Sequence, residues 1–193
     1  MTSHFDSAIR KIDEANAQDP RHEVCEGHQI PKELLYARRL SQWLHQVAPE
    51  ASEALRLAAR AQHLCRWEVP RSDYPMDRAG YLKWRTFLYS YHADKATRIL
   101  EGVGYDLETI ERVTMLLRKR NLKRDADVQA LEDAICLVFL EYELEAFAQK
   151  HDEEKLISII QKTWKKMSPT GQEFAAKLSL APDVAALLEK AIE

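Results

Sequence analysis

The most apolar run of the chain is Glu132-Asp133-Ala134-Ile135-Cys136-Leu137-Val138-Phe139-Leu140, and two carboxylates open it. A run of this kind inside a helical pattern predicts a helix that carries both carboxylates into the core. An unpaired charge in an apolar medium costs several kcal/mol or more, so a buried carboxylate needs a cation or several donors. We therefore expect Asp133 and Glu132 to meet a cation or donors inside the protein.

Apolar residues recur at helical spacing on both sides of this run. The pattern predicts helices over residues 3–17, 31–48, 50–63, 78–102, 106–120, 125–150 and 152–164, and two short ones that start at residues 168 and 182. Residues 20–30 are predicted to form a loop, and residues 64–77 an irregular loop rich in arginine and aromatic residues. Five glycines in 193 residues leave little turn punctuation for a many-stranded sheet. The sequence thus predicts an all-α fold, one compact domain over residues 1–193 with short C-terminal helices.

The net charge argues against nucleic acid as a partner, and the distribution of apolar residues argues against a membrane. With 28 basic and 31 acidic residues, the net charge of -3 gives no global basic field, so nucleic acid is not indicated as a partner. No apolar stretch approaches the ~18 residues of a membrane span, and the first residues lack a signal-peptide pattern. The three cysteines form no CxxC motif. These features predict a cytoplasmic protein without a membrane partner, and they leave its oligomeric state open.

Two histidines on apolar helix faces are candidate ligands of a metal ion. His92 shares a face with Leu88 and Ala96, and His63 closes the third predicted helix. With Asp133 they would form a set of two histidines and one carboxylate, which suits Mn, Zn, Fe or Mg and leaves positions for water and a phosphate oxygen. Glu132 would be a fourth ligand or the general base. In the alternative interpretation, these side chains form a polar network in the core without metal.

The irregular loop and the helix after it supply candidate ligand-binding side chains: Arg66, Arg71, Tyr74, Arg78, Trp84 and Arg85. Arginine offers a planar fork for phosphate, and an aromatic face can stack a base or hold an arginine by a cation-π contact. This combination predicts a small phosphorylated ligand or a nucleotide. The alternative is that the arginines pin the loop through ion pairs with its acidic residues.

Several motifs resemble an uncharacterised, all-helical family with a domain of unknown function. They are Ile12-Asp13-x-x-Asn16-x-x-Asp19-Pro20, Tyr36-Ala37-x-Arg39-x-Ser41-x-Trp43, Ala58-Ala59-Arg60-Ala61-Gln62-His63-x-x-Arg66-Trp67, Pro70-Arg71-x-x-Tyr74-Pro75, Gly80-Tyr81-x-x-Trp84-Arg85, His92-Ala93 and Leu131-Glu132-Asp133-Ala134. They span nearly the whole chain, and the family implies no established activity.

More distantly, residues 58–141 resemble the core of HD-type metal-dependent phosphohydrolases. Those enzymes have a histidine at a helix end, a His-Asp dipeptide on a later helix and an aspartate beyond it, which His63, His92 and Asp133 match. Ala93 stands where the family has the aspartate of the dipeptide, and Asp94 lies about 100° further around the helix. The departure leaves open a site with one metal ion, a site completed by Glu132, or an inactive enzyme.

The resemblance implies hydrolysis of a phosphoester of a nucleotide or small molecule. The alternative from another class is a non-catalytic module that binds a nucleotide, RNA or protein and retains a degenerate metal site.

Overall fold

Most helices begin with a polar residue that caps the first turn, the residue type preferred at this position. In seven of them a serine or aspartate before the helix accepts a hydrogen bond from a backbone N–H of the first turn: Ser3, Ser52, Asp77, Asp106, Asp125, Asp152 and Ser168. Gly104 ends the longest helix in the left-handed conformation, with φ of 96°, which glycine adopts without steric cost. The local signals for helix starts and stops therefore agree with the helices that form.

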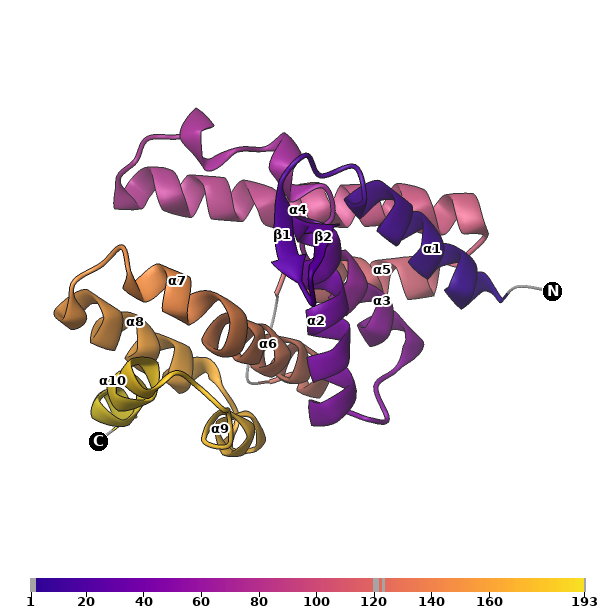
Figure 1. Cartoon of the computed structure of the whole chain (residues 1–193). Helices are drawn as coiled ribbons and strands as arrows, with labels where there is room; N and C mark the ends of the chain where they lie inside the picture. The colour runs from indigo at the N-terminus through magenta and orange to yellow at the C-terminus, as the bar shows by residue number, and fades with distance from the viewer. Residues whose placement is uncertain (1–2, 120–121, 123, 193) are drawn as a thin grey trace. The chain divides into compact units, whose positions relative to one another are not determined.

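The computed structural model describes residues 3–119, 122 and 124–192, and it is all-α with one short hairpin (Figure 1). The α-helices are α1 His4–Asn16, α2 Lys32–Val47, α3 Glu53–Ala61, α4 Arg78–Val103, α5 Leu107–Leu117, α6 Ala126–Val138, α7 Leu144–Ala148, α8 Glu153–Lys166, α9 Pro169–Ala175 and α10 Pro182–Ile192. A π-helical turn, η3 Phe139–Glu143, joins α6 to α7. The all-α prediction is confirmed, and none of the described helices is long and apolar enough to cross a membrane.

The chain divides into two compact units. The first contains residues 1–41 and 51–121, and the second contains residues 42–50 and 122–193. The segment that resembles the HD-type core, residues 58–141, has a part in each unit. We describe each unit by itself, and the single domain over residues 1–193 stays a prediction.

The first unit has a helical core. Helix α3 packs against α1 and α5, and α4 packs against α1 and α5. Large apolar side chains of these helices are almost completely buried: Ile12, Leu55, Leu57, Leu100 and Leu116. Burial of each such side chain stabilises the fold by about 1.5–3 kcal/mol. Because α3 and α4 are anchored in this way, the side chains at the end of α3 and in the middle of α4 have fixed positions.

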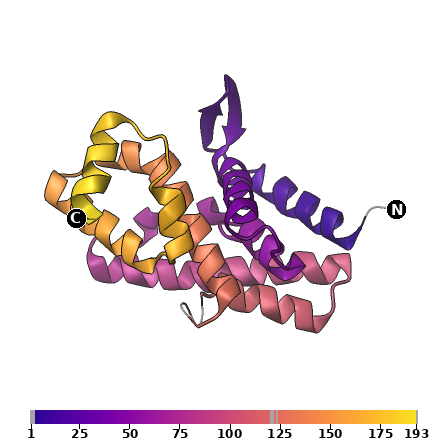
Figure 2. The same cartoon turned by 90° about the horizontal axis from the view of Figure 1, so that it is seen from below.

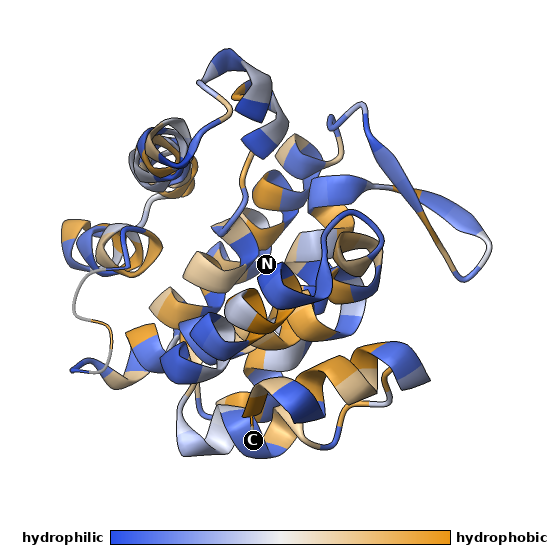
Figure 3. Cartoon of the chain, turned by 90° about the vertical axis from the view of Figure 1, so that its left-hand side faces the viewer, coloured by the Kyte–Doolittle hydropathy of each residue, from blue (hydrophilic) through white to orange (hydrophobic). Residues whose placement is uncertain are grey.

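The prediction of a loop over residues 20–30 is wrong for most of that segment. β1 His22–Cys25 pairs antiparallel with β2 His28–Pro31, and Cys25 lies opposite His28. The turn residues Glu26 and Gly27 both have positive φ, 51° and 79°, as expected for a tight two-residue hairpin turn. Figure 2 shows this hairpin projecting from the helices of its own unit, and Figure 3 shows it as largely hydrophilic.

The second unit is built around α6. Helix α6 packs against α8 and α9, and α10 packs against α7 and α8. Leu137, Val138 and Leu140 of the apolar run are 0–1% exposed, so the predicted buried helix is confirmed. The indole Nε1 of Trp43 donates to Glu141 Oε2 at 2.7 Å, and its ring meets the Phe174 ring edge-on at 5.9 Å.

The start of α9 comes close to α6 at Gly171, which leads to a prediction about stability. A Cβ atom at this position would lie 2.7 Å from Cγ and 2.8 Å from Oδ1 of Asp133. Asp133 is 3% exposed and hydrogen-bonded, so it has little room to move. We expect Gly171→Ala to lower the free energy of unfolding by about 1–3 kcal/mol, as overpacking does elsewhere. Urea denaturation measures this loss. Gly102→Ala, which meets only the end of Lys11 at 4.0 Å, is the control and should cost less.

Candidate functional site

His63 follows directly on the end of α3 and is fixed by two neighbours. Its ring stacks on Tyr36 of α2, with ring centroids 3.8 Å apart and planes inclined by 14°. Its Nδ1 lies 3.1 Å from Oε2 of Glu33, which is in the first turn of α2 and completely buried. The stack and the hydrogen bond together determine the orientation of the imidazole.

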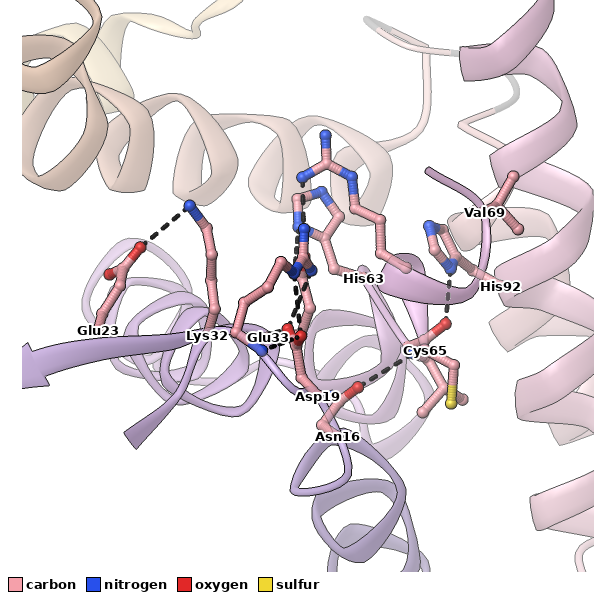
Figure 4. Close-up of polar contacts among 12 residues, drawn as sticks. Asn16, Asp19, Glu23, Lys32, Glu33, His63, Cys65, Val69 and His92 are labelled. Atoms are coloured by element: carbon pink, nitrogen blue, oxygen red, sulfur yellow. Dashed lines mark hydrogen bonds and ion pairs between the residues drawn. The ribbon is translucent and has the colours of Figure 1, made fainter. Parts of the chain in front are cut away.

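His92 lies in the middle of α4 and is 2% exposed, as its apolar helix face predicts. Its Nδ1 lies 2.9 Å from the carbonyl oxygen of Leu64. Its Nε2 is buried and has no hydrogen-bond partner among the described residues. The rings of His92 and His63 are neighbours, with centroids 6.0 Å apart, so the structure brings these two predicted ligands together (Figure 4).

Both histidines carry their proton on Nδ1. A backbone carbonyl can only accept a hydrogen bond, so Nδ1 of His92 must be the donor. The carboxylate of Glu33 is ionised: burial opposes its charge, but the hydrogen bond from His63 and the charges of Arg66 and Arg21 lower its pKa to about 2. It too can only accept. In the neutral ring Nε2 is then the atom with the lone pair in both histidines.

Burial keeps the two imidazoles neutral at pH 7. Burial, with the charge of Arg66 as the next cause, lowers the pKa of His63 to about 4. Burial lowers the pKa of His92 to about 3. A neutral imidazole is the form that binds a metal ion, so neither ligand would have to lose a proton.

An unusual backbone turn links His63 to Arg66. Cys65 has φ of 55°, a left-handed conformation that non-glycine residues adopt only when neighbouring contacts hold it. The N–H of Cys65 donates to Oδ1 of the buried Asn16 at 3.1 Å. The same turn presents the Leu64 carbonyl to His92. It therefore places both histidines and Arg66 in one region.

Arg66 is a predicted phosphate-binding residue whose charge acts on both histidines. Its guanidinium lies over the ring of Trp84 at 5.0 Å, and its Nη1 is 3.9 Å from Oε1 of Glu33. Its guanidinium makes no hydrogen bond within the described part of the chain, and its side chain is 28% exposed. The indole of Trp84 is fixed in turn, because its Nε1 donates to the Val69 carbonyl at 2.8 Å.

Arg71, Tyr74, Arg78 and Arg85, the other predicted binding residues, lie in different surroundings. Arg71 donates to the carbonyl oxygens of Tyr74, Pro75 and Asp77, at 2.9, 2.6 and 3.2 Å, so it holds the loop together. The Tyr74 ring contacts Phe87. Arg78 is exposed in the first turn of α4, and Arg85 donates to the Tyr89 hydroxyl at 2.5 Å. For Arg71 these contacts favour the structural interpretation.

Asp133 and Glu132 belong to the second unit and have partners there. Ser168 N–H and Gln129 Nε2 donate to Asp133 Oδ1 at 2.8 and 3.0 Å, and Ser168 Oγ donates to Oδ2 at 2.5 Å. Glu132 is 4% exposed and pairs with Lys166 at 3.5 Å. The donors that a buried carboxylate requires are thus supplied within the unit, and burial alone does not demand a metal ion. That Asp133 joins the two histidines stays a prediction.

Two further observations bear on the predicted metal site. Among residues 3–119, 122 and 124–192, no group of three or more histidine, cysteine, aspartate or glutamate side chains could hold a metal ion. Asp94, the acidic residue next to the broken dipeptide, is exposed and pairs with Arg118 at 3.5 Å. Among the described residues of the first unit, the predicted ligands that lie together are His63 and His92.

Sequence reasoning missed the buried network beneath His63. Asp19 and Arg21 lie in the loop between α1 and β1, and Glu33 lies at the start of α2, on the other side of the hairpin. Figure 4 shows Asp19 and Glu33 close to His63. Arg21 donates to both carboxylates, to Asp19 at 2.9 Å twice and to Glu33 at 2.8 Å. The only signal was Asp19-Pro20 within a family motif, because nothing in the sequence spacing relates Glu33 to a histidine 30 residues away.

The family model for a domain of unknown function, DUF4202, matches residues 6–188, and the chain belongs to this family. No curated protein and no solved structure matches the chain.

Proposed function

We propose that the chain is a metal-dependent phosphohydrolase-like protein that acts on a nucleotide or a small phosphoester. One observation carries the proposal: two neighbouring neutral imidazoles use Nδ1 for fixed acceptors and keep Nε2 for a ligand. Metal-binding histidines commonly donate the other ring N–H to a carboxylate or a backbone carbonyl, and His63 and His92 have one of each. The distant resemblance to HD-type enzymes assigns the same two residues to metal.

The buried Nε2 of His92 supports the assignment. Buried polar atoms are hydrogen-bonded in the large majority of cases, and an unpaired acceptor costs free energy. A divalent ion of the kind predicted, Mn, Zn, Fe or Mg, would be bound by Nε2 of His92 and of His63. The resemblance adds Asp133 as a third ligand, and the sequence prediction adds Glu132 as a fourth ligand or the general base. When bound, such an ion supplies hydroxide from water at neutral pH.

Arg66 would hold the phosphate. None of the described residues accepts a hydrogen bond from its guanidinium, and contacts with Trp84 and Glu33 hold the guanidinium near the histidine pair. A planar guanidinium can make two parallel hydrogen bonds to a phosphate. Arg21 is less available, because it already binds two carboxylates.

A second candidate function is a nucleotide- or phosphate-binding module without metal. The absence of a three-ligand group among the described residues favours it. In this case the neutral histidines and Arg66 would bind the phosphate directly, and no hydrolysis would occur.

Metal titration of protein purified without a histidine tag tests the proposal. We expect one Mn²⁺ or Zn²⁺ per chain by calorimetry, and a melting temperature that rises with metal because binding at 100 times Kd stabilises by about 2.7 kcal/mol. His92→Gln should abolish both effects, whereas His28→Gln, at an exposed position at the start of β2, should retain them. A wild-type melting temperature that changes neither with chelator nor with added metal would refute the metal site.

Phosphate binding separates the two candidate functions. With metal, Arg66→Ala should raise KM or Kd for phenyl phosphate at least tenfold. Arg56→Ala is the matched control. Arg56 is on α3, and its guanidinium also lies over an aromatic ring, 4.1 Å from the centroid of Phe5. Binding that persists in chelator and is lost in Arg66→Ala would favour the module without metal.

A further inference from the structure

We propose that Glu33 is a positioning residue, whose carboxylate holds His63 in the tautomer and orientation that present Nε2 to a metal ion. The part of this inference that concerns metal affinity rests on the proposed function, whereas the tautomer is a property of the protein without metal.

The geometry at Glu33 leaves only one proton arrangement. Its side chain is completely buried, and its two oxygens face different partners: Oε2 faces His63 Nδ1 at 3.1 Å, and Oε1 accepts from Arg21 Nη2 at 2.8 Å. An ionised carboxylate has no proton to give. The proton between it and His63 therefore belongs to Nδ1, and the lone pair of the imidazole is on Nε2.

A second carboxylate, Asp19, contacts the backbone of Glu33 and shares Arg21 with it. Asp19 Oδ2 accepts the backbone N–H of Glu33 at 3.2 Å, and both oxygens of Asp19 bind Arg21 at 2.9 Å. At the base of the hairpin, the backbone N–H of Lys32 donates to the carbonyl oxygen of Arg21 at 2.8 Å. Figure 4 shows Glu33 and Asp19 below the His63 ring. Rotation of the Glu33 carboxylate would break its bonds to both His63 and Arg21.

Asp19 and Glu33 differ in one respect that matters for the test. Both are buried carboxylates, and both bind Arg21. Glu33 hydrogen-bonds to His63, and Asp19 does not. Asp19→Asn is therefore a matched control that removes the same charge from the same network without changing a partner of the imidazole.

Glu33→Gln should have two separate effects. The Gln amide can donate to Nδ1, so the proton of His63 should move at least in part to Nε2. Loss of a carboxylate behind a metal-binding histidine commonly weakens metal affinity 10–100-fold. Asp19→Asn should keep the tautomer and change the metal Kd by less than about threefold, although it costs stability through the lost bonds to Arg21 and Glu33.

Long-range ¹H–¹⁵N NMR of the imidazoles at pH 7 reads the tautomer of metal-free protein. Wild type should show His63 protonated on Nδ1, and Glu33→Gln should show the shift toward Nε2. Wild-type His63 protonated on Nε2 would overturn the inference even if no variant folded. Calorimetric Kd values for Mn²⁺ complete the test, and equal losses in Glu33→Gln and Asp19→Asn would show an effect of charge alone and also overturn it. Wild type that binds no metal but has the Nδ1 tautomer would refute the proposed function and leave Glu33 as the residue that positions His63.

Discussion

Lowering the pH from 7.5 to 5.0 should cost the folded protein about 4 kcal/mol through His63 and His92 alone. Their pKa values are lowered from 6.5 to about 4 and about 3 in the folded state, so both stay neutral at pH 5 while the unfolded chain binds protons. Their stabilisation is complete above pH 6.5 and is lost as the pH falls toward the folded pKa values. Each contributes about 2 kcal/mol of the loss by pH 5.

Glu33 does not contribute in this window. Its pKa is lowered from 4.5 to about 2, so its stabilisation is present above pH 4.5 and disappears only as the pH falls toward 2. Urea denaturation at both pH values measures the loss, and His92→Gln should reduce it by about half. His28→Gln, at an exposed position of the hairpin, should keep the full pH dependence. The same pH dependence in His92→Gln and wild type would contradict a buried neutral imidazole at position 92.

The helices could be predicted from the sequence because their signals are local. The cap residues and the apolar spacing determine where α1, α4, α5 and α8 begin and end to within a few residues. The hairpin was missed because each strand has only four residues, two polar ones followed by two apolar ones, so the alternating apolar pattern of a strand is absent. Its signal was the Glu26-Gly27 turn, which is a weak indication by itself.

The candidate site was predicted in part for the same physical reason. His92 could be found because helical spacing places it on a buried face, and His63 because it closes a helix next to a loop. Glu33, Asp19 and Arg21 could not be found from the sequence. Glu33 contacts His63, and Asp19 and Arg21 contact Glu33, only because the hairpin brings its two ends together. For Asp133 burial was predicted correctly, but sequence could not reveal that Ser168 and Gln129 supply its donors.

Asp133→Ala should lower the free energy of unfolding by about 3–5 kcal/mol, because it leaves the three partly buried donors of Ser168 and Gln129 without their acceptor. Asp133→Asn should cost about 1–2 kcal/mol. Its amide oxygen can accept from the Ser168 N–H, and its amide nitrogen can donate to Ser168 Oγ. Urea denaturation in chelator measures both losses, and equal losses would contradict the hydrogen-bonded role of the carboxylate.

The same variants decide whether Asp133 is also the third metal ligand that the sequence predicts. A neutral amide oxygen is a much poorer ligand for a divalent ion than a carboxylate, so a ligand role requires Asp133→Asn to weaken metal binding at least 100-fold. Ser168→Ala is the matched control, because it removes a partner of Asp133 and the cap of α9 but keeps the carboxylate. If Ser168→Ala binds metal with the wild-type Kd and Asp133→Asn no longer binds it, Asp133 is a metal ligand. Wild-type metal affinity in both variants would restrict Asp133 to its network with α9, because a ligand cannot be neutralised without an effect on the ion it binds.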